Sequence, residues 1–358
     1  MIGSSITFAE RLLRWYDVSR RDLPWRVDPS KGQSETPDPY HVMISEAMLQ
    51  QTQVATVIPY FHRFLERFPT LASLADADEQ DVLRLWQGLG YYSRARNLLA
   101  AARMTRDQLG GQLPTTVEQL LKLPGVGRYT AGAIASIAFE TKAPIVDGNV
   151  ARVLCRVDKI ESDPRDKATL DLLWTRAEQI LPGERFGDFN SSLMELGATV
   201  CTPRSPQCLI CPVREHCEAR AAGLQETIPA PKKTKVNPLE QRWTFIVQHG
   251  QHFLIEQRPP SGRWAGMWQF VTLPAADGVN PRAALESAVG ATLDEAQPKG
   301  IVTHALTHRR YEFTVFAAVA SDRFPSGPRT WATLGELDRL PLSKPQLKVA
   351  AMAHQMVE

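Results

Sequence analysis

The stretch LPGVGRYTAGAI, residues 123–134, places glycines on both sides of a valine and then runs directly into an apolar segment. Helical patterns at 116–122 and 129–139 flank the turn, so the sequence predicts a helix-hairpin-helix over about 116–139. Glycine permits a positive φ and a close backbone approach, and the first N–H groups of the second helix suit one phosphate. From this stretch alone, a plain turn between two helices is the alternative.

The composition is that of an ordinary globular protein. The chain has 358 residues, 43% hydrophobic and 22% charged, which is enough for two or three domains with cores. The formal net charge of +2 does not by itself indicate a nucleic-acid partner. No apolar run approaches the roughly 18 residues of a membrane span, and the N-terminus lacks a signal pattern, so no membrane association is expected.

The hydrophobic period changes once along the chain. Before about residue 222 apolar residues recur at helical spacing in many short segments, whereas from 241 the period is two. The Pro- and Lys-rich stretch between them has no periodicity. The sequence therefore predicts a multidomain protein: an all-α domain over 1–222, a linker over 223–240, and an α+β domain with a mixed or antiparallel sheet over 241–358.

Individual elements are also predicted. Helices are expected over 6–16, from 41 to about 68 with Pro59 starting a second helix, and over 78–87, 93–109, 116–122, 129–139, 148–157, 166–180, 187–199 and 280–293, with a weaker one near the C-terminus. Strands are expected over 242–248, 252–258, 267–273, 300–306 and 310–320.

Four of the five cysteines form a cluster with the spacing Cys201-x6-Cys208-x2-Cys211-x5-Cys217, while Cys155 stands alone. This distribution argues against a secreted disulfide framework and favours an intracellular, metal-binding protein. Four thiolates bind either one zinc ion or an iron–sulfur cluster. Because zinc ribbons usually pair two CxxC motifs and only one is present, the spacing favours iron–sulfur, with zinc still open.

The order of these motifs carries a resemblance. The hairpin, then VDGNVARVLCR at 146–156, then the cysteines at 6-2-5 spacing resemble the helix-hairpin-helix DNA glycosylases of the endonuclease III superfamily. Within it, SEAMLQQTQV (45–54), GLGYYSRARNL (88–98) and VDGNV look like the adenine DNA glycosylases of the MutY type, which excise adenine mispaired with 8-oxoguanine. The resemblance covers most of 5–222 and, more loosely, a Nudix-like C-terminal domain. It implies a [4Fe-4S] cluster on the four cysteines.

The resemblance also implies the catalytic groups. Breaking the bond from sugar to adenine needs an acid that protonates the base and a carboxylate beside the oxocarbenium-like sugar. Glu46 matches the acid, and burial in its apolar stretch would raise its pKa. Asp147 matches the stabilising carboxylate and is also a helix N-cap by pattern. Asn149 would orient water or Asp147.

Tyr129 distinguishes two kinds of glycosylase. Relatives that also cut the DNA backbone carry a lysine at this place, which forms a Schiff base with the sugar. Tyrosine has no such amine. The resemblance therefore implies a monofunctional glycosylase in which Tyr129 is a hydrogen-bonding or packing group beside Asp147.

Further residues match binding positions of the family. DNA-binding positions are Gln51, Thr52, Tyr91, Gly125, Val126 and Gly127. Adenine-pocket positions are Trp25, Arg26 and Ser191, and Ser191 stands where relatives usually carry Gln or Glu. Lesion-recognition positions are Leu306, Thr307 and His308, and Leu306 replaces a frequent phenylalanine. In the Nudix-like domain only Glu286 stands where a working Nudix hydrolase needs several metal-binding glutamates, so hydrolysis of a nucleotide is not expected.

The expected partner is double-stranded DNA with an adenine:8-oxoguanine or adenine:guanine mispair, bound by a monomer in the cytoplasm at the bacterial nucleoid. Two alternatives remain. A thymine or oxidised-pyrimidine glycosylase with lyase activity is disfavoured by Tyr129 and by the second domain. A non-catalytic iron–sulfur protein is disfavoured because it needs neither Glu46 nor Asp147.

Overall fold

The structure, a computed structural model, describes residues 6–27, 36–231, 236–294, 296–323 and 328–356. Its backbone contacts divide the chain into two compact units. The first comprises Met1–Asp76 and Asn97–Lys233, and the second comprises Ala77–Arg96 and Thr234–Glu358. Residues 29–39, which the family resemblance gives as a loop longer than in many members, lie largely outside the described residues. No helix in the described ranges is long and apolar enough to cross a membrane.

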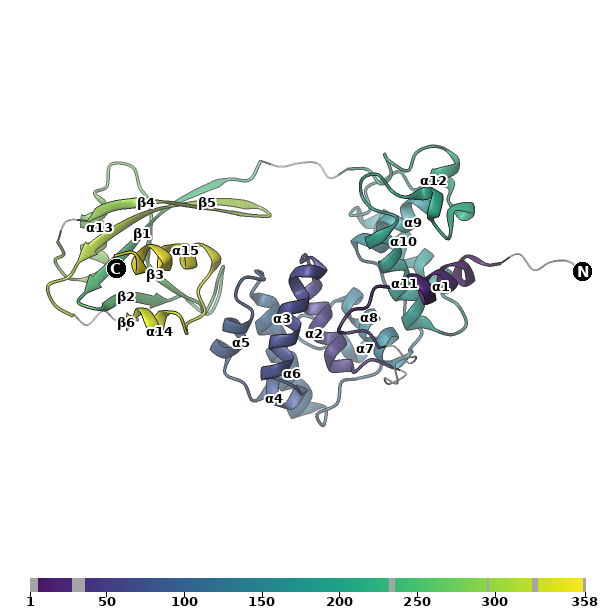
Figure 1. The fold of residues 1–358 in the computed structure, drawn as a ribbon, viewed down its shortest axis with the longest axis horizontal. Helices are drawn as coiled ribbons and strands as arrows, with labels where there is room; N and C mark the ends of the chain where they lie inside the picture. The colour runs from purple at the N-terminus through teal and green to yellow at the C-terminus, as the bar shows by residue number, and fades with distance from the viewer. Residues whose placement is uncertain (1–5, 28–35, 232–235, 295, 324–327, 357–358) are drawn as a thin grey trace, which may run out of the picture. The chain divides into compact units, whose positions relative to one another are not determined.

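Helices make up the regular structure before the linker, as predicted (Figure 1). They are α1 (Phe8–Ser19), α2 (Pro39–Leu49), α3 (Val54–Arg67), α4 (Leu71–Ala75), α5 (Glu79–Leu85), α6 (Ser93–Gln108), α7 (Val117–Leu120), α8 (Arg128–Phe139), α9 (Gly148–Val157), α10 (Lys167–Gln179), α11 (Phe186–Thr199) and α12 (Glu218–Ala221). Short 3₁₀ turns, η2 (Cys208–Ile210) and η3 (Arg214–His216), lie in the cysteine loop.

The helix break predicted at Pro59 is wrong. Helix α3 begins at Val54 and contains Pro59, and the break falls before it, at the turn where Gln51 has a φ of 57°. A proline removes only one backbone hydrogen bond at that point. Burial of Val57 and Phe61 on one face of the helix offsets this loss.

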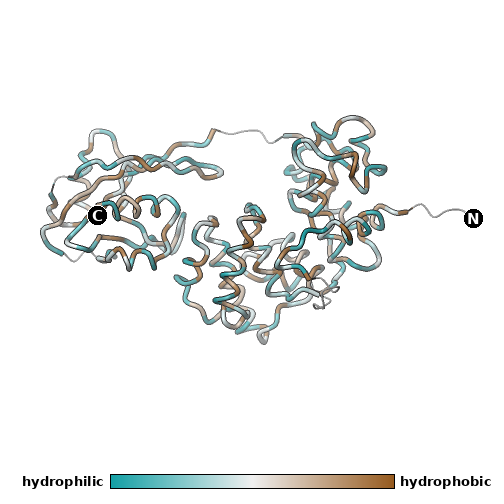
Figure 2. The backbone as a smooth tube through the Cα atoms, viewed as in Figure 1, coloured by the Kyte–Doolittle hydropathy of each residue, from teal (hydrophilic) through white to brown (hydrophobic). Residues whose placement is uncertain are grey.

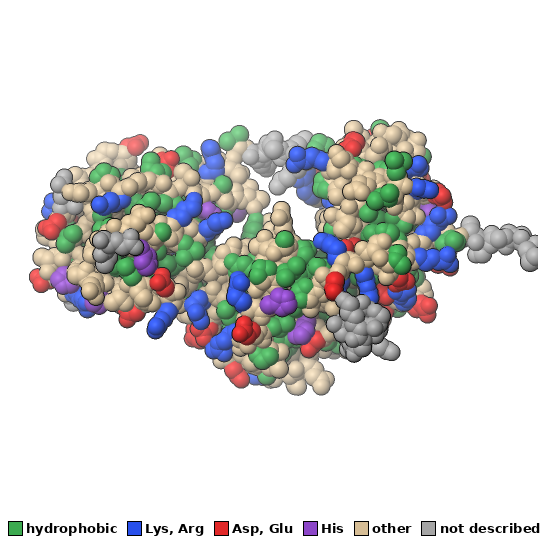
Figure 3. Space-filling view, in the orientation of Figure 1, with side chains coloured by type: hydrophobic (Ala, Val, Ile, Leu, Met, Phe, Trp, Pro, Cys, Tyr) green, Lys and Arg blue, Asp and Glu red, His purple; other side chains and the backbone are tan. Residues whose placement is uncertain are grey.

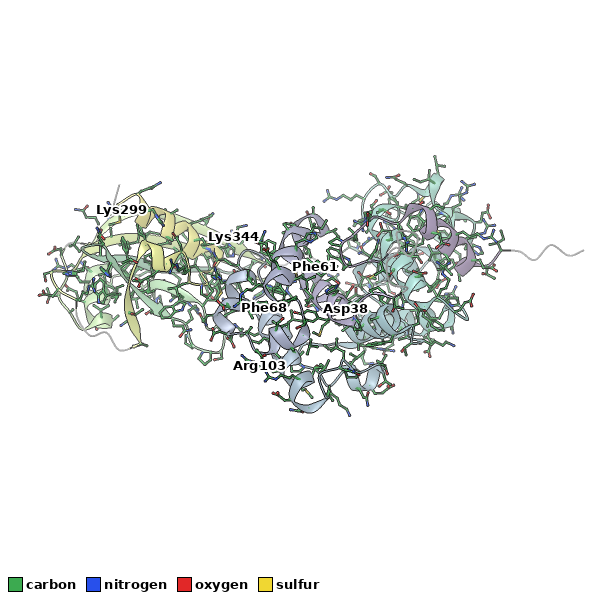
Figure 4. All side chains as sticks on the ribbon, turned by 60° about the horizontal axis from the view of Figure 1, so that its bottom comes forward. Asp38, Phe61, Phe68, Arg103, Lys299 and Lys344 are labelled. Carbon is green, nitrogen blue, oxygen red and sulfur yellow. The ribbon has the colours of Figure 1, made fainter. Side chains whose placement is uncertain are left out.

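Helix α8 lies at the centre of the helical packing and contacts α2, α7 and α11. A small residue allows the close contact with α11, since a Cβ on Gly187 of α11 would lie 2.7 Å from the carbonyl oxygen of Ser136 on α8. Figure 2 shows polar and apolar residues mixed along the helices, and Figure 4 labels Phe61 and Phe68 among them; each is 1% exposed. This packing brings α2, α8, α9 and α11 around one pocket.

The second unit is built on a mixed sheet, and the predicted α+β class is confirmed. Its strands are β1 (Leu239–His249), β2 (His252–Gln257), β3 (Trp268–Pro274), β4 (Gln297–Leu306), β5 (Arg309–Val319) and β6 (Arg329–Thr333), in the order β4-β5-β1-β3-β2-β6. Strands β1 and β5 are parallel and the other pairs antiparallel. Strand β6 was not among the predicted strands.

Each face of the sheet has its own core, because successive side chains of a strand point to opposite faces. Ile246 packs with α14 (Leu334–Leu337) and α15 (Lys344–His354). Phe245 packs on the other face with α13 (Pro281–Val289), which is shorter than the predicted 280–293 helix.

Candidate active site

A pocket of about 490 Å³ in the first unit collects residues that are far apart in the sequence. Its lining includes nine of the predicted site residues: Trp25, Arg26, Glu46, Gln51, Thr52, Tyr129, Asp147, Asn149 and Ser191. Helix α2 supplies Glu46, the start of α8 supplies Tyr129, and the start of α9 supplies Asp147. The pocket therefore joins the predicted acid, the predicted stabilising carboxylate and the predicted adenine-binding residues.

Glu46 is buried at 6% exposure, because the segment of α2 around it faces the core. The hydroxyl of Tyr129 donates a hydrogen bond of 2.7 Å to Glu46 Oε2. Burial is the largest influence and raises the pKa of Glu46 to about 7; the Tyr129 hydrogen bond lowers this pKa, Asp147 raises it and Arg26 lowers it. This carboxyl can therefore carry a proton near neutral pH.

Asp147 is the N-cap of α9, and its Oδ1 accepts a hydrogen bond of 2.7 Å from the Val150 N–H. Burial raises the pKa of this carboxyl, while backbone N–H groups of Val150 and Asn149 lower it. The cap fixes the side chain at the positive end of the helix, which favours a negative charge. Glu46 and Asp147 therefore have different hydrogen-bond partners. Such a difference allows one carboxyl to act as the acid while the other stays ionised.

Tyr129 keeps its proton beside Glu46 and donates a hydrogen bond to it. Its pKa is raised well above the usual value by burial, and further by Glu46 and Asp147, so the phenol keeps its proton. Its hydroxyl also lies 3.1 Å from Met194 Sδ. The hydrogen bond thus joins Tyr129 to Glu46, and Asp147, beside which the resemblance puts Tyr129, lines the same pocket.

Glu195, which the sequence reasoning did not select, holds the pocket's arginines. Its side chain is fully buried and accepts from Arg21 Nε at 2.6 Å and from Arg26 Nη2 at 2.9 Å. Burial raises its pKa, but the two arginines outweigh that effect and leave the pKa below the usual value. Glu195 lies one helical turn after Ser191, so the same-face spacing could have revealed it.

Asn149 is tied to the following helical turn and to the cysteine loop. Its Oδ1 accepts a 2.8 Å hydrogen bond from Arg152 Nη2, which also donates to the Gly197 carbonyl oxygen at 2.8 Å. Arg152 Nε donates to the carbonyl oxygen of Cys201 at 2.8 Å. One guanidinium therefore connects α9, α11 and the start of the cysteine loop.

The glycine turn lies before α8 as predicted and outside the lining of this pocket. Gly125 has a φ of 75°, and a Cβ there would lie 2.5 Å from Asn97 Cβ, so both conformation and space require glycine. Gly127 is the N-cap of α8 with no side-chain cap, and a Cβ there would meet nothing within 4 Å. The turn's outer side is open to a ligand, with Val126 half-buried between the glycines.

Of the four cysteines of the loop, Cys201, Cys211 and Cys217 pack against the core that contains α9. Their charges influence one another: burial raises the pKa of Cys211 to about 12, and the other three cysteines raise it as well. Arg156 Nη1 donates to Cys201 Sγ at 3.4 Å. A thiol-only donor set with a neighbouring cation fits a cluster whose irons each take one thiolate.

The predicted lesion-recognition residues lie in the second unit, at the turn between β4 and β5. Thr307 and His308 are exposed there, and Leu306 packs against the core under α15. Tyr91 belongs to the same unit, has a φ of 48°, and its hydroxyl lies 2.5 Å from Thr307 Oγ1. These four residues line a second pocket of about 370 Å³.

Comparison with known proteins gives three family matches. Residues 44–179 match the HhH-GPD superfamily of base excision DNA repair proteins, residues 201–217 match the iron-sulfur binding domain of endonuclease III, and residues 242–352 match the NUDIX domain. A solved structure of a thermostable thymine-DNA glycosylase is 30% identical with a TM-score of 0.52, covering 60% of this chain and 95% of that one. Fold and matches define a base excision DNA glycosylase.

Curated relatives specify the family within that class. Adenine DNA glycosylase of Rattus norvegicus is 38% identical over 403 residues, covering 97% of this chain and 78% of the relative. Adenine DNA glycosylase of Homo sapiens is 38% identical over 405 residues, covering 97% and 74%. The chain belongs to the adenine DNA glycosylases, enzymes that hydrolyse N-glycosyl bonds, and the predicted fold class, enzyme class and [4Fe-4S] cofactor are confirmed.

Proposed function

We propose that this protein removes adenine from DNA when it is paired with 8-oxoguanine or guanine, with Glu46 as general acid and Asp147 as the group that stabilises the sugar cation. The observation that carries the proposal is the buried Glu46, whose pKa is about 7, in the same pocket as Asp147. The names of the relatives supply the base, adenine.

The chemistry follows from the two environments. Protonated Glu46 donates its proton to a ring nitrogen of the flipped adenine, which then leaves as a neutral base. The carboxylate of Asp147, fixed by the N–H of Val150, stabilises the positive charge that develops on the sugar. Water then adds to the sugar and gives up a proton, which the Glu46 carboxylate accepts. Asn149, which lines the pocket, is the proposed group that orients this water.

Tyr129 supports hydrolysis of the N-glycosyl bond without cleavage of the DNA backbone. A Schiff base with the sugar needs an amine, and this position carries a phenol that donates to Glu46. Release of the base therefore leaves an intact DNA backbone with an abasic sugar.

Engagement of DNA rests on the turn and on one strained residue, Gln51, with its neighbour Thr52. The open Gly127 and the start of α8 suit one phosphate of the backbone. Gln51 is exposed with a φ of 57°, an uncommon backbone conformation for a residue with a side chain. It is the proposed group that fills the gap left by the flipped nucleotide, with Thr52 beside it.

Recognition of 8-oxoguanine is proposed for Thr307 and His308, whose exposure at the β4–β5 turn makes them accessible to an exposed base. Figure 3 shows Lys and Arg side chains distributed among carboxylates on the face in view, so phosphate contacts must come from local groups. Binding is expected to weaken steeply as salt rises.

A gel assay tests the proposal with a duplex that pairs adenine with 8-oxoguanine, with and without alkali after incubation. We expect strand cleavage only after alkali. Cleavage without alkali would instead support a lyase, and no cleavage under either condition would contradict both enzymatic hypotheses.

The variant Glu46→Gln tests whether Glu46 acts as the general acid or only supports the structure. We expect excision to fall by at least about 100-fold, the range of general acid catalysis, while duplex binding is retained. Glu66→Gln, at an exposed position of α3, is the matched control and should keep full activity. Loss of duplex binding in Glu46→Gln would show that Glu46 is structural.

A further inference from the structure

The second unit contains a separate hollow of about 260 Å³ that the glycosylase reaction does not use. It is lined by three arginines, Arg242, Arg258 and Arg263, together with Glu240, Thr272, Trp264, Tyr311 and Phe313. None of the predicted lesion-recognition residues belongs to this lining.

The sheet explains how these residues meet. Strands β1 and β5 are parallel with Glu240 opposite Tyr311 and Arg242 opposite Phe313. Residues two apart in a strand share one face, so the charged pair lies beside the aromatic pair. Arg258 follows β2 directly and Arg263 lies in the loop before β3. The hollow is therefore assembled from rigid strands and one short loop.

Positive charge exceeds negative charge in this lining. Glu240 is the single carboxylate there, and it is shared by Arg242 at 3.2 Å, by Arg263 at 3.5 Å and by Arg309. Among the described residues Arg258 has no carboxylate within ion-pair distance. Its Nη1 donates to Gln269 Oε1 at 2.7 Å and its Nε to the Arg263 carbonyl oxygen at 2.9 Å. The lining thus holds three guanidinium groups and one carboxylate, and that carboxylate already pairs with Arg242, Arg263 and Arg309.

The guanidinium groups interact unfavourably with one another. Burial lowers the pKa of Arg258 below the usual value, Arg242 and Arg263 lower it further, and Glu256 opposes this. Crowded cations of this kind are relieved by an anion, and planar guanidinium groups match the paired oxygens of phosphate.

The aromatic residues hold the arginines in place. The Trp264 and Tyr311 rings are 5.2 Å apart, and the Tyr311 and Phe313 rings are stacked at 5.6 Å. Arg263 lies 5.4 Å from the Tyr311 ring centroid and Arg258 5.8 Å from that of Trp264. Cation–π contacts and the buried rings limit the rotation of the guanidinium groups, which reduces the entropy cost of binding.

We propose that Arg242, Arg258 and Arg263 form a binding site for one phosphate group on the second unit. The hollow is smaller than the roughly 300–1,000 Å³ of pockets that enclose whole small-molecule ligands, so it fits a single phosphate group. This group comes from one of two sources, a phosphate of the DNA backbone or free inorganic phosphate. The site binds and does not hydrolyse, because its lining supplies one carboxylate and no cluster of them.

The test compares the full-length protein with Arg258→Gln and Arg263→Gln. Inorganic phosphate should raise the melting temperature of the wild type more than chloride does at equal ionic strength. Both variants should lose at least about half of that rise, because each removes one of the three cations. Arg282→Gln, which removes an arginine paired with Glu286 on α13, should keep it.

Binding to a mismatch-free duplex distinguishes the two sources. If the site holds a backbone phosphate, the variants should bind with a salt slope shallower by about one than the wild type. If it holds free phosphate, the slope stays unchanged while the phosphate-dependent rise in melting temperature is lost. The proposal is overturned if neither the rise nor the slope differs between the wild type and the variants that remain folded.

The two variants also protect the test against misfolding. Both arginines lie in the loop between β2 and β3, so neither substitution replaces a residue of a strand. A variant with an unchanged circular dichroism spectrum and an unchanged melting temperature in chloride is taken as folded.

Discussion

At the scale of single residues, Glu46 is balanced between opposing neighbours. Burial raises its pKa to about 7, while Tyr129 and Arg26 oppose that rise. A general acid works only while protonated, so we expect excision to decline as the pH rises through about 7. The measurement is the single-turnover excision rate between pH 5.5 and 9. A rate that increases over this whole interval would contradict the assignment of Glu46 as the acid.

The variant Tyr129→Phe tests the hydrogen bond to Glu46. The Tyr129 hydroxyl stabilises the ionised carboxylate, so its removal raises the pKa of Glu46 and moves the decline in rate to higher pH. Tyr60→Phe, outside the pocket, should leave the profile in place. A decline displaced toward lower pH would mean that the hydroxyl stabilises the protonated form instead.

Glu46 also affects stability. Its folded pKa is higher than the ordinary value of 4.5, so its favourable contribution is complete below that value and is lost as pH rises through about 7. Glu46→Gln cannot ionise. The difference in melting temperature between variant and wild type should therefore move in favour of the variant between pH 5 and 9. A constant difference would show that Glu46 does not titrate in this range.

At the scale of elements, the contact between α9 and α11 positions Asn149. A Cβ on Gly197 of α11 would lie 2.7 Å from Asn149 Cβ. We expect Gly197→Ala to cost about 1–3 kcal/mol of unfolding free energy and to slow excision, because Asn149 must move. Gly183→Ala is the control, since a Cβ there would meet nothing within 4 Å. Thermal unfolding and single-turnover excision rates are measured for both variants. An unaltered excision rate in Gly197→Ala would show that Asn149 takes no part in the reaction.

Elements with strong periodicity and clear caps could be predicted from the sequence. Helix α9 has the predicted bounds 148–157 because Asp147 caps it and a helical apolar face follows. The break predicted at Pro59 is wrong, because burial of one face of the helix outweighs the loss of one backbone hydrogen bond. Strand β6 has only five residues and forms by pairing with β2, a partner that its own pattern does not reveal.

At the scale of the whole molecule, the proposed excision and the proposed lesion recognition belong to different units. The excision pocket lies in the first unit and the proposed lesion-recognition turn in the second. A chain ending at Lys233 should therefore still excise adenine but lose most of its preference for 8-oxoguanine over guanine in the opposite strand. The ratio of single-turnover rates on the two duplexes measures this. A preserved ratio would place the discrimination in the helical unit.

The sequence by itself determined the local features: the glycine turn, the cysteine spacing, the caps and the change from helical to strand periodicity. These depend on residues near one another in the chain. The motif order also located Glu46 and Asp147 through a family resemblance. Only the tertiary structure showed that Tyr129 donates to Glu46, that buried Glu195 holds two arginines, and that three arginines crowd one hollow of the sheet. Burial and pairing between distant segments set these contacts and pKa values, and no local pattern encodes them.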